Sequence, residues 1–210
     1  TKFWHYIPKN ILFICNKISF LRKIHFLLFS FLVLFFSQCA KKGRPGGGPK
    51  DEDAPLFVTA NPPYESINFD KNEINIYFNE YIKLKDLNKQ LIISPPLNPA
   101  NPSLISPQGS PSKFINIKIL DTLKENSTYI FDFGNSVQDN NEANTLERFK
   151  YVFSTGSYID SLNLSGNVKN SFKSESVEDI KLLLFRLDSS YTDSAVYNRK
   201  PDYVTSSLDS

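Results

Sequence analysis

The stretch Glu73-Ile74-Asn75-Ile76-Tyr77-Phe78-Asn79 decides the fold, because its apolar side chains recur at every second position. Successive side chains of a β-strand point to opposite faces, so this pattern predicts a strand with one buried face. Four other stretches show the same period of two. They are Ser66–Asp70, Ile115–Ile119, Tyr129–Phe133 and Phe149–Phe153.

Turn-forming residues separate these strands. Asp70-Lys71-Asn72 lies between the first two strands and predicts a hairpin turn. Prolines at 62–63, 95–96 and between 99 and 111 mark loops, because proline cannot donate a hydrogen bond to a β-ladder. Lys83–Gln90 is long enough for a helical turn or two at most. About seven short strands in roughly 100 residues predict an all-β fold, an antiparallel sandwich of the immunoglobulin-like (Ig-like) kind.

An apolar segment near the start is set aside before the fold is assigned. Phe26–Phe36 contains one polar residue, Ser30, and Arg22 and Lys23 precede it. As a helix the segment spans roughly 17 Å at about 1.5 Å per residue, little more than half of a hydrocarbon core of about 30 Å. We therefore expect a signal peptide over residues 1–38. Because no Met begins the chain, we also expect the first residues to be non-native.

Ser37-Gln38-Cys39-Ala40 follows this segment and resembles the lipobox of bacterial lipoproteins. The resemblance implies that Cys39 becomes the first mature residue and is acylated on its sulfur and its amine. Gln38 departs from the small residue usual at its position. The alternatives are an ordinary secretory signal with a coincidental Cys, or a short membrane anchor. Several acyl chains would anchor the protein stably, since each buried methylene contributes about 0.8 kcal/mol.

Residues 40–54 are rich in Gly, Pro and Lys and predict a flexible tether. Gly46-Gly47-Gly48 lacks the Lys-Ser/Thr ending of a phosphate-binding loop. The predicted organisation has four parts. They are the signal peptide (1–38), the lipidated Cys and tether (39–54), the Ig-like domain (55–156) and an incomplete second β-sandwich module (157–210).

Six stretches resemble bacterial Ig-like domains of the S-layer type. They are Ala60–Pro63, Ile74–Ile82, Leu91–Pro96, Leu123–Phe131, Asp139–Asn144 and Phe149–Gly156. Over roughly residues 39–190 the chain is similar to Bacteroidota lipoproteins that begin with such a domain. The resemblance implies the fold and an outer-envelope location, and it implies no reaction.

Residues 157–210 predict the start of a second module. Leu162–Val168, Asp179–Leu187 and Lys200–Val204 are expected strands, and the second is so continuously apolar that we expect burial on both faces. These residues resemble the opening of carboxypeptidase-regulatory-like or transthyretin-like β-sandwiches. Two or three strands do not form a stable sheet alone, so we expect the protein to continue beyond Ser210.

Composition limits the chemistry. The chain of 210 residues has 24 Lys and Arg against 22 Asp and Glu, a net charge of +2. Residues 1–38 contain five of the basic residues and no acidic one, so the remainder carries −3. A charge this close to zero gives no electrostatic surface for nucleic acid. His5, His25 and Cys15 all lie in the leader, which leaves no His-based or Cys-based nucleophile and no usual zinc ligand set, and we expect no cofactor and no metal.

The remaining candidate chemistry rests on carboxylates. Glu80 and Asp139 each lie at a strand end and are the candidates for a paired-carboxylate glycosidase site, against the alternative that both are solvated loop acids. Asp139, Asn141, Glu142 and Asn144 form an oxygen-rich loop of the kind that binds Ca²⁺, but without the spacing of an EF-hand. The alternative there is a plain turn.

Exposed tyrosines are the candidates for binding a glycan. Tyr77 lies on the strand face opposite Ile76 and Phe78, although a tyrosine with a solvated hydroxyl commonly has no such role. The other candidates are Tyr64, Tyr81, Tyr158, Tyr191, Tyr197 and Tyr203.

Two functions follow from these patterns. The first is a lipid-anchored, non-catalytic structural or interaction protein of the outer envelope, with the membrane and envelope proteins as partners. The alternative is the anchoring end of a surface protein that binds or degrades glycans through a module outside this sequence. Lys41 and Lys42 follow Cys39 directly, while Asp51-Glu52-Asp53 lies further off, so the periplasmic and cell-surface faces of the outer membrane both stay open.

Overall fold

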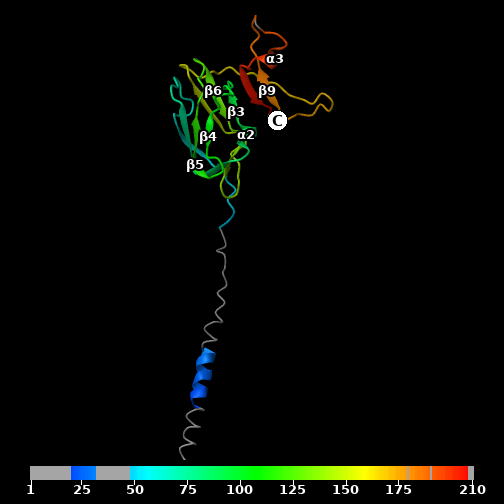
Figure 1. Cartoon of the computed structure of the whole chain (residues 1–210). Coiled ribbons are helices and arrows are strands. Elements are labelled where there is room, and N and C mark those ends of the chain that lie inside the picture. Colours follow the sequence, from blue (N-terminus) through cyan, green and yellow to red (C-terminus); the bar gives the residue numbers. More distant parts are fainter. Residues whose placement is uncertain (1–19, 32–47, 179, 190, 208–210) are drawn as a thin grey trace, which may run out of the picture. The chain divides into compact units, whose positions relative to one another are not determined.

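The computed structural model describes residues 20–31, 48–178, 180–189 and 191–207. The chain divides into two units, Thr1–Pro49 and Lys50–Ser210, and each is described by itself. In the first unit, residues 20–31 are helical (Figure 1). No helix within the described ranges combines the length and the apolar character needed to cross a membrane.

Five strands of the second unit form one antiparallel sheet around a long central strand, β2 (Glu73–Leu84). β2 pairs with β1 (Phe57–Asn61) and β7 (Val137–Asp139) and also with β5 (Ser112–Lys118), which in turn pairs with β4 (Leu104–Ser106). The stretch that decides the fold is therefore the start of the strand that most of this sheet contacts.

A second antiparallel sheet has the order β3-β6-β8. Its strands are β3 (Ile92–Ser94), β6 (Thr128–Asp132) and β8 (Lys150–Ser154). A short helix, α2 (Leu87–Gln90), connects β2 to β3, in agreement with the single turn or two expected there. The all-β prediction is confirmed, and the expected strands at 73, 115, 129 and 149 correspond to β2, β5, β6 and β8.

The core lies between the two sheets. It contains Ile74, Ile76 and Phe78 of β2 with Ile115 and Ile117 of β5, all buried as the alternation predicts. Aromatic side chains of the second sheet close it from the other side, and the Phe153 ring centroid lies 4.1 Å from that of Phe69 and 5.6 Å from that of Tyr129. The two sheets are joined where the Phe78 ring of β2 packs on the Phe149 ring next to β8, with ring centroids 5.5 Å apart.

Tyr129 stands at the start of β6, and its hydroxyl accepts a hydrogen bond of 2.8 Å from the backbone N–H of Lys124, five residues upstream. A tyrosine that bonds back to the preceding corner in this way is a hallmark of Ig-like sandwiches. Burial, followed by repulsion from Asp121, raises the pKa of the Tyr129 phenol against the opposing effect of this hydrogen bond.

The expected strand at Ser66–Asp70 and its hairpin turn are wrong. This segment makes backbone bonds to β8, from Glu65 N–H to Val152 O at 2.8 Å and from Phe69 N–H to Ser154 O at 2.9 Å, with one isolated parallel bridge between Ser66 and Phe153. Asp70-Lys71-Asn72 then crosses to β2 in the other sheet. Of the two alternating apolar residues only Phe69 is buried, whereas Ile67 is exposed, because the segment bonds to β8 and then crosses to the other sheet instead of forming the first arm of a hairpin.

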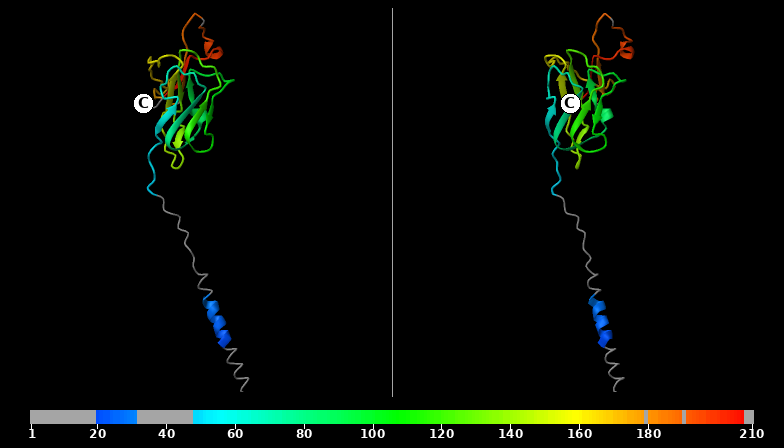
Figure 2. Two further views of the ribbon diagram at one scale, coloured as in Figure 1. Left: turned by 90° about the vertical axis from the view of Figure 1, so that its left-hand side faces the viewer. Right: turned by 60° about the vertical axis from the view of Figure 1, so that its left-hand side comes forward.

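Two strands follow the sandwich, β9 (Lys181–Leu184) and β10 (Tyr203–Ser206), which pair antiparallel, with the short helix α3 (Ala195–Asn198) between them. β10 lies against β3, and the Val204 N–H donates to the Ser94 hydroxyl at 3.0 Å. Figures 1 and 2 show α3 at the end of this unit opposite to the point where residues 50–55 enter.

Two expectations for this region are wrong. Leu162–Val168 forms no strand, and β9 is not buried on both faces, because Leu182, Leu183 and Leu184 are 37–47 % exposed. A hairpin of two strands has too few neighbours within the described residues to cover either face of β9. The expected strand near Lys200–Val204 is confirmed as β10.

Candidate functional site

The candidate carboxylates Glu80 and Asp139 are brought to one end of the five-stranded sheet. β2 and β7 pair there with Ile82 opposite Asp139, and Glu80 lies two residues before Ile82 on the inward-facing side of β2. Asp139 is buried, with 3 % of its surface exposed. In Figure 1 the loop after β7 lies beside the entering chain, and the Asn144 side-chain amide donates to the carbonyls of Asp51 (3.0 Å) and Asp53 (2.9 Å).

The carboxylate of Asp139 is fully engaged by its own loop. Its oxygens accept backbone N–H bonds from Asn141 (2.6 Å), Glu142 (2.7 Å), Ala143 (3.2 Å) and Asn144 (2.8 Å). Burial by itself would raise the pKa of this carboxyl, but the four donors outweigh burial and hold the pKa below its ordinary value. The loop is organised around a single anion that the protein supplies.

This geometry does not support the calcium hypothesis. The N–H groups of Asn141, Glu142 and Asn144 point at Asp139 and occupy the oxygens that a cation would need, and the Asn144 side chain donates rather than accepts. Across the described ranges, no group of three or more His, Cys, Asp or Glu is arranged to hold a metal ion. The oxygen-rich loop is a turn stabilised by a buried carboxylate.

Glu80 has the opposite electrostatic environment. Burial is the first cause that raises the pKa of its carboxyl, and repulsion from Asp139, Asp51, Glu142 and Asp53 adds to it. Two neighbouring carboxyls, one with a raised pKa and one with a lowered pKa, are the pattern of a general acid and its ionised partner in hydrolases. Here the carboxylate of Asp139 is buried and already accepts four backbone N–H bonds, so its oxygens are occupied by the protein itself.

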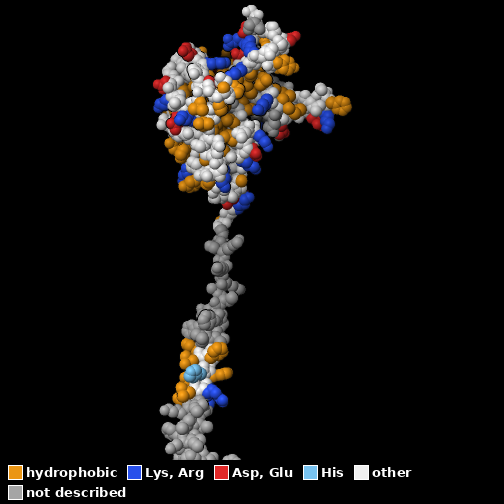
Figure 3. Space-filling model, viewed as in Figure 1, with side chains coloured by type: hydrophobic (Ala, Val, Ile, Leu, Met, Phe, Trp, Pro, Cys, Tyr) orange, Lys and Arg blue, Asp and Glu red, His pale blue; other side chains and the backbone are white. Residues whose placement is uncertain are grey.

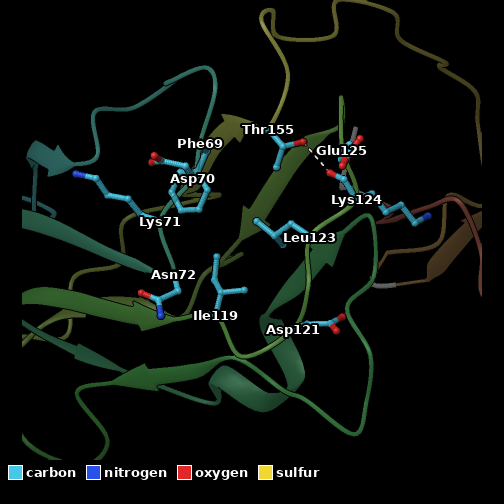
Figure 4. A pocket seen from close by; sticks show the side chains of 10 residues that line it. All are labelled: Phe69, Asp70, Lys71, Asn72, Ile119, Asp121, Leu123, Lys124, Glu125 and Thr155. Carbon is cyan, nitrogen blue, oxygen red and sulfur yellow. Dashed lines mark hydrogen bonds between the residues drawn. The ribbon is translucent and has the colours of Figure 1, made fainter.

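A hollow of about 300 Å³ lies elsewhere, between the loops at 69–72 and 119–125. Figure 4 shows the apolar side chains Phe69, Ile119 and Leu123 in its middle, with Thr155 bonded to the Lys124 carbonyl at 2.7 Å. Its charged side chains point to different sides, and the Asp121 carboxylate already accepts the Asn98 N–H at 2.6 Å. Because its polar groups do not converge on one point, this hollow lacks the arrangement of a ligand-binding site. A second open hollow, of about 350 Å³, lies beside α2. Neither hollow is lined by Glu80 or Asp139.

Among the candidate tyrosines, Tyr77 lies on the outward face of β2 beside Phe114 of β5. Tyr81, further along β2, is exposed and contacts Lys113, the residue before Phe114. Tyr64 instead packs on Phe57 and Tyr151. Tyr158, Tyr197 and Tyr203 are exposed and Tyr191 is half-buried, all in the region after the sandwich. Sequence reasoning missed Phe114, although it lies on the opposite strand face from Ile115 and Ile117, as Tyr77 does from Ile76 and Phe78.

Charged side chains form no dominant patch of one sign on the face in Figure 3, where blue and red atoms are interspersed with apolar ones. Cys39, the predicted lipidation site, lies outside the described residues, as do His5 and Cys15. The candidate residues of the described sandwich are thus carboxylates with structural roles and a group of exposed aromatic side chains on the five-stranded sheet.

Comparison with known proteins agrees with the architecture. Residues 51–155, half of the chain, match the family of bacterial Ig-like domains. No curated protein matches the chain. The match begins at Asp51, where Asn144 fixes the entering chain, and ends one residue after β8. The two-sheet sandwich, the hydrogen bond from Lys124 N–H to the Tyr129 hydroxyl and this match together show that the chain belongs to the bacterial Ig-like domain family.

Proposed function

We propose that this protein is a lipid-anchored, non-catalytic structural or interaction protein of the bacterial outer envelope, of the Bacteroidota kind. Cys39 carries the acyl chains, residues 40–50 form the tether, and the Ig-like domain is a spacer and a protein-contact module. Ig-like domains of this family fit a structural or interaction role and are typically non-catalytic.

One observation carries the proposal. The Asn144 side chain bonds to the backbone of Asp51 and Asp53, where the family match also begins, so the Ig-like domain starts about a dozen residues after Cys39. A lipid at Cys39 would hold the domain a short distance from the membrane. The non-catalytic part is supported by Asp139, whose carboxylate binds four N–H groups of its own loop.

The anchor is tested by replacing Cys39 with alanine in cells that process lipoproteins. The parent chain is expected to incorporate labelled palmitate and to sediment with outer membranes, and Cys39→Ala is expected to lose both properties. Cys15→Ala is the matched control, because Cys15 lies in the predicted leader, and it is expected to behave as the parent. Palmitate incorporation or membrane retention that persists in Cys39→Ala would overturn lipidation at this residue.

A further inference from the structure

The two outer faces of the sandwich differ. On the β3-β6-β8 sheet, β10 lies against β3, and Ile92 and Ser94 are buried there. On the five-stranded sheet, Tyr77 is 39 %, Phe114 42 % and Tyr81 55 % exposed. Three large aromatic side chains are thus exposed along this sheet, and an exposed apolar patch of a few hundred Å² is often a functional surface.

These three side chains form a row, called here the aromatic row. Tyr77 and Phe114 are direct partners across β2 and β5, with ring centroids 5.8 Å apart. Tyr81 lies further along β2, beyond an irregularity in the β2–β5 register between Tyr77 and Ile82. The Lys113 ammonium is 5.4 Å from the centre of the Tyr81 ring and restrains that ring by a cation–π contact. The rings are therefore held by the sheet.

Side-chain amides continue the aromatic row along the same two strands. Asn75 and Asn116 are the next outward-facing cross-strand pair, and Asn116 Nδ2 donates to Asn75 Oδ1 at 2.8 Å and also to Glu73 Oε1. These bonds use the Asn116 N–H groups and the Asn75 side-chain oxygen. The Asn75 amide N–H groups and the Asn116 side-chain oxygen have no hydrogen-bond partner among the described residues. A fixed donor and a fixed acceptor thus stand beside the aromatic rings.

The size of the aromatic row favours a small ligand. A buried aromatic side chain contributes about 150–250 Å², so three half-exposed ones offer on the order of 300 Å². A stable protein interface needs roughly 800 Å² from each partner. Rings that present an apolar surface next to amides match a sugar, whose C–H faces are apolar and whose edge carries hydroxyls. We propose that this face binds a neutral glycan chain, with the aromatic row against the sugar rings and Asn75 and Asn116 bonded to hydroxyls.

The proposal goes beyond the spacer role and does not depend on the acyl anchor. The test is native affinity electrophoresis of the full chain, purified in detergent, through gels containing mixed-linkage β-glucan, xyloglucan, galactomannan, α-mannan or dextran. At least one of these neutral polysaccharides is expected to retard the protein. Retardation by none of them overturns the proposal. The parent chain and Cys39→Ala are run in parallel, so loss of the anchor and loss of glycan binding are scored separately.

The double variant Tyr77→Ala/Phe114→Ala is expected to weaken retardation at least tenfold while its circular dichroism and cooperative unfolding persist. Asn75→Ala, which keeps every ring, is expected to weaken it several-fold. The matched control is Tyr158→Ala/Tyr197→Ala, which removes two exposed aromatics outside the sandwich and is expected to bind as the parent does. Retardation that the Tyr77→Ala/Phe114→Ala variant retains would disprove the assignment. A third outcome is that no glycan retards the parent chain, while the parent self-associates and the Tyr77→Ala/Phe114→Ala variant does not. That outcome would overturn glycan binding and show that this face binds a protein partner.

Discussion

The hydroxyl of Tyr151 donates to the carbonyl of Pro62 at 2.7 Å from a fully buried position. Tyr151→Phe removes the donor and leaves that carbonyl without its partner inside the protein, so we expect the free energy of unfolding to fall by about 1–3 kcal/mol. Urea denaturation measures the loss. Tyr158→Phe, at an exposed position, is the control and is expected to be neutral. An unchanged midpoint for Tyr151→Phe would mean that solvent replaces the bond.

Tyr151 also predicts how stability depends on alkaline pH. Burial raises its pKa to about 12 from an ordinary value of 10.0, although a contact with Ser66 opposes the rise. Between these values the unfolded chain loses the phenolic proton and the native chain keeps it, so stability declines as pH rises, by about 1.4 kcal/mol per unit. Denaturation at several alkaline pH values is expected to show this decline in the parent and a shallower one in Tyr151→Phe. Equal slopes would contradict the assignment.

Asp139 makes the opposite prediction at acid pH. Its lowered pKa means that the native chain stays ionised after the unfolded carboxyl has protonated, so its contribution is complete above pH 3.8 and is lost as pH falls further. Asp139→Asn replaces an acceptor of four N–H bonds with a group that is half donor, and we expect a loss of roughly 2–4 kcal/mol at neutral pH. Thermal unfolding measures it, with exposed Asp70→Asn as the control. Equal melting of the two variants would refute the role of the carboxylate.

At the scale of elements, a period of two correctly located β2, β5, β6 and β8, because a strand with one buried face leaves that pattern in the sequence. The same rule failed at Ser66–Asp70, where the chain bonds to β8 before it crosses to the other sheet. β4 and β7 have three residues each, too few to show any period. The aromatic row needed the register of β2 against β5, since Phe114 is far from Tyr77 in sequence and only pairing brings them together.

Glu80, near the β2–β7 contact, was a candidate from the sequence, but only the structure shows the acidic residues that surround it. Its carboxyl has a pKa raised above 4.5 by burial and by four neighbouring acids, so the native chain binds a proton more tightly than the unfolded chain. Stability therefore falls as pH rises through that window, and ionised Glu80 opposes folding at neutral pH. Glu80→Gln is expected to stabilise the protein at pH 7 by up to about 1 kcal/mol, and the gain is expected to vanish in acid.

Thermal unfolding as a function of pH measures the effect of Glu80→Gln. Glu147→Gln is the control, because Glu147 is exposed and has no part in this group of acids. Destabilisation by Glu80→Gln at neutral pH would show that the carboxylate makes a favourable contact that outweighs the repulsion.

At the scale of the whole molecule, the buried core belongs to the sandwich alone. Every residue of the contiguous core lies between Ala60 and Phe153, and none comes from the region after residue 156. The β9–β10 hairpin is attached from outside, through β10 on β3 and the bond from Val204 N–H to Ser94. The Ig-like domain should thus fold without the hairpin, whereas the hairpin, with its leucines exposed, depends on the sandwich.

A chain that ends at Asp160 tests this hierarchy. It retains β1 to β8 and the bond from Asp160 N–H to the Thr128 hydroxyl, so we expect one cooperative unfolding transition. Uncovering Ile92 and removing the Val204 N–H donor to Ser94 should lower the free energy of unfolding by about 1–2 kcal/mol. A chain that ends at Arg148 lacks β8, and with it Tyr151 and Phe153, and is expected to remain unfolded. If the chain ending at Asp160 also fails to unfold cooperatively, the region after Asp160 must be part of the folding unit.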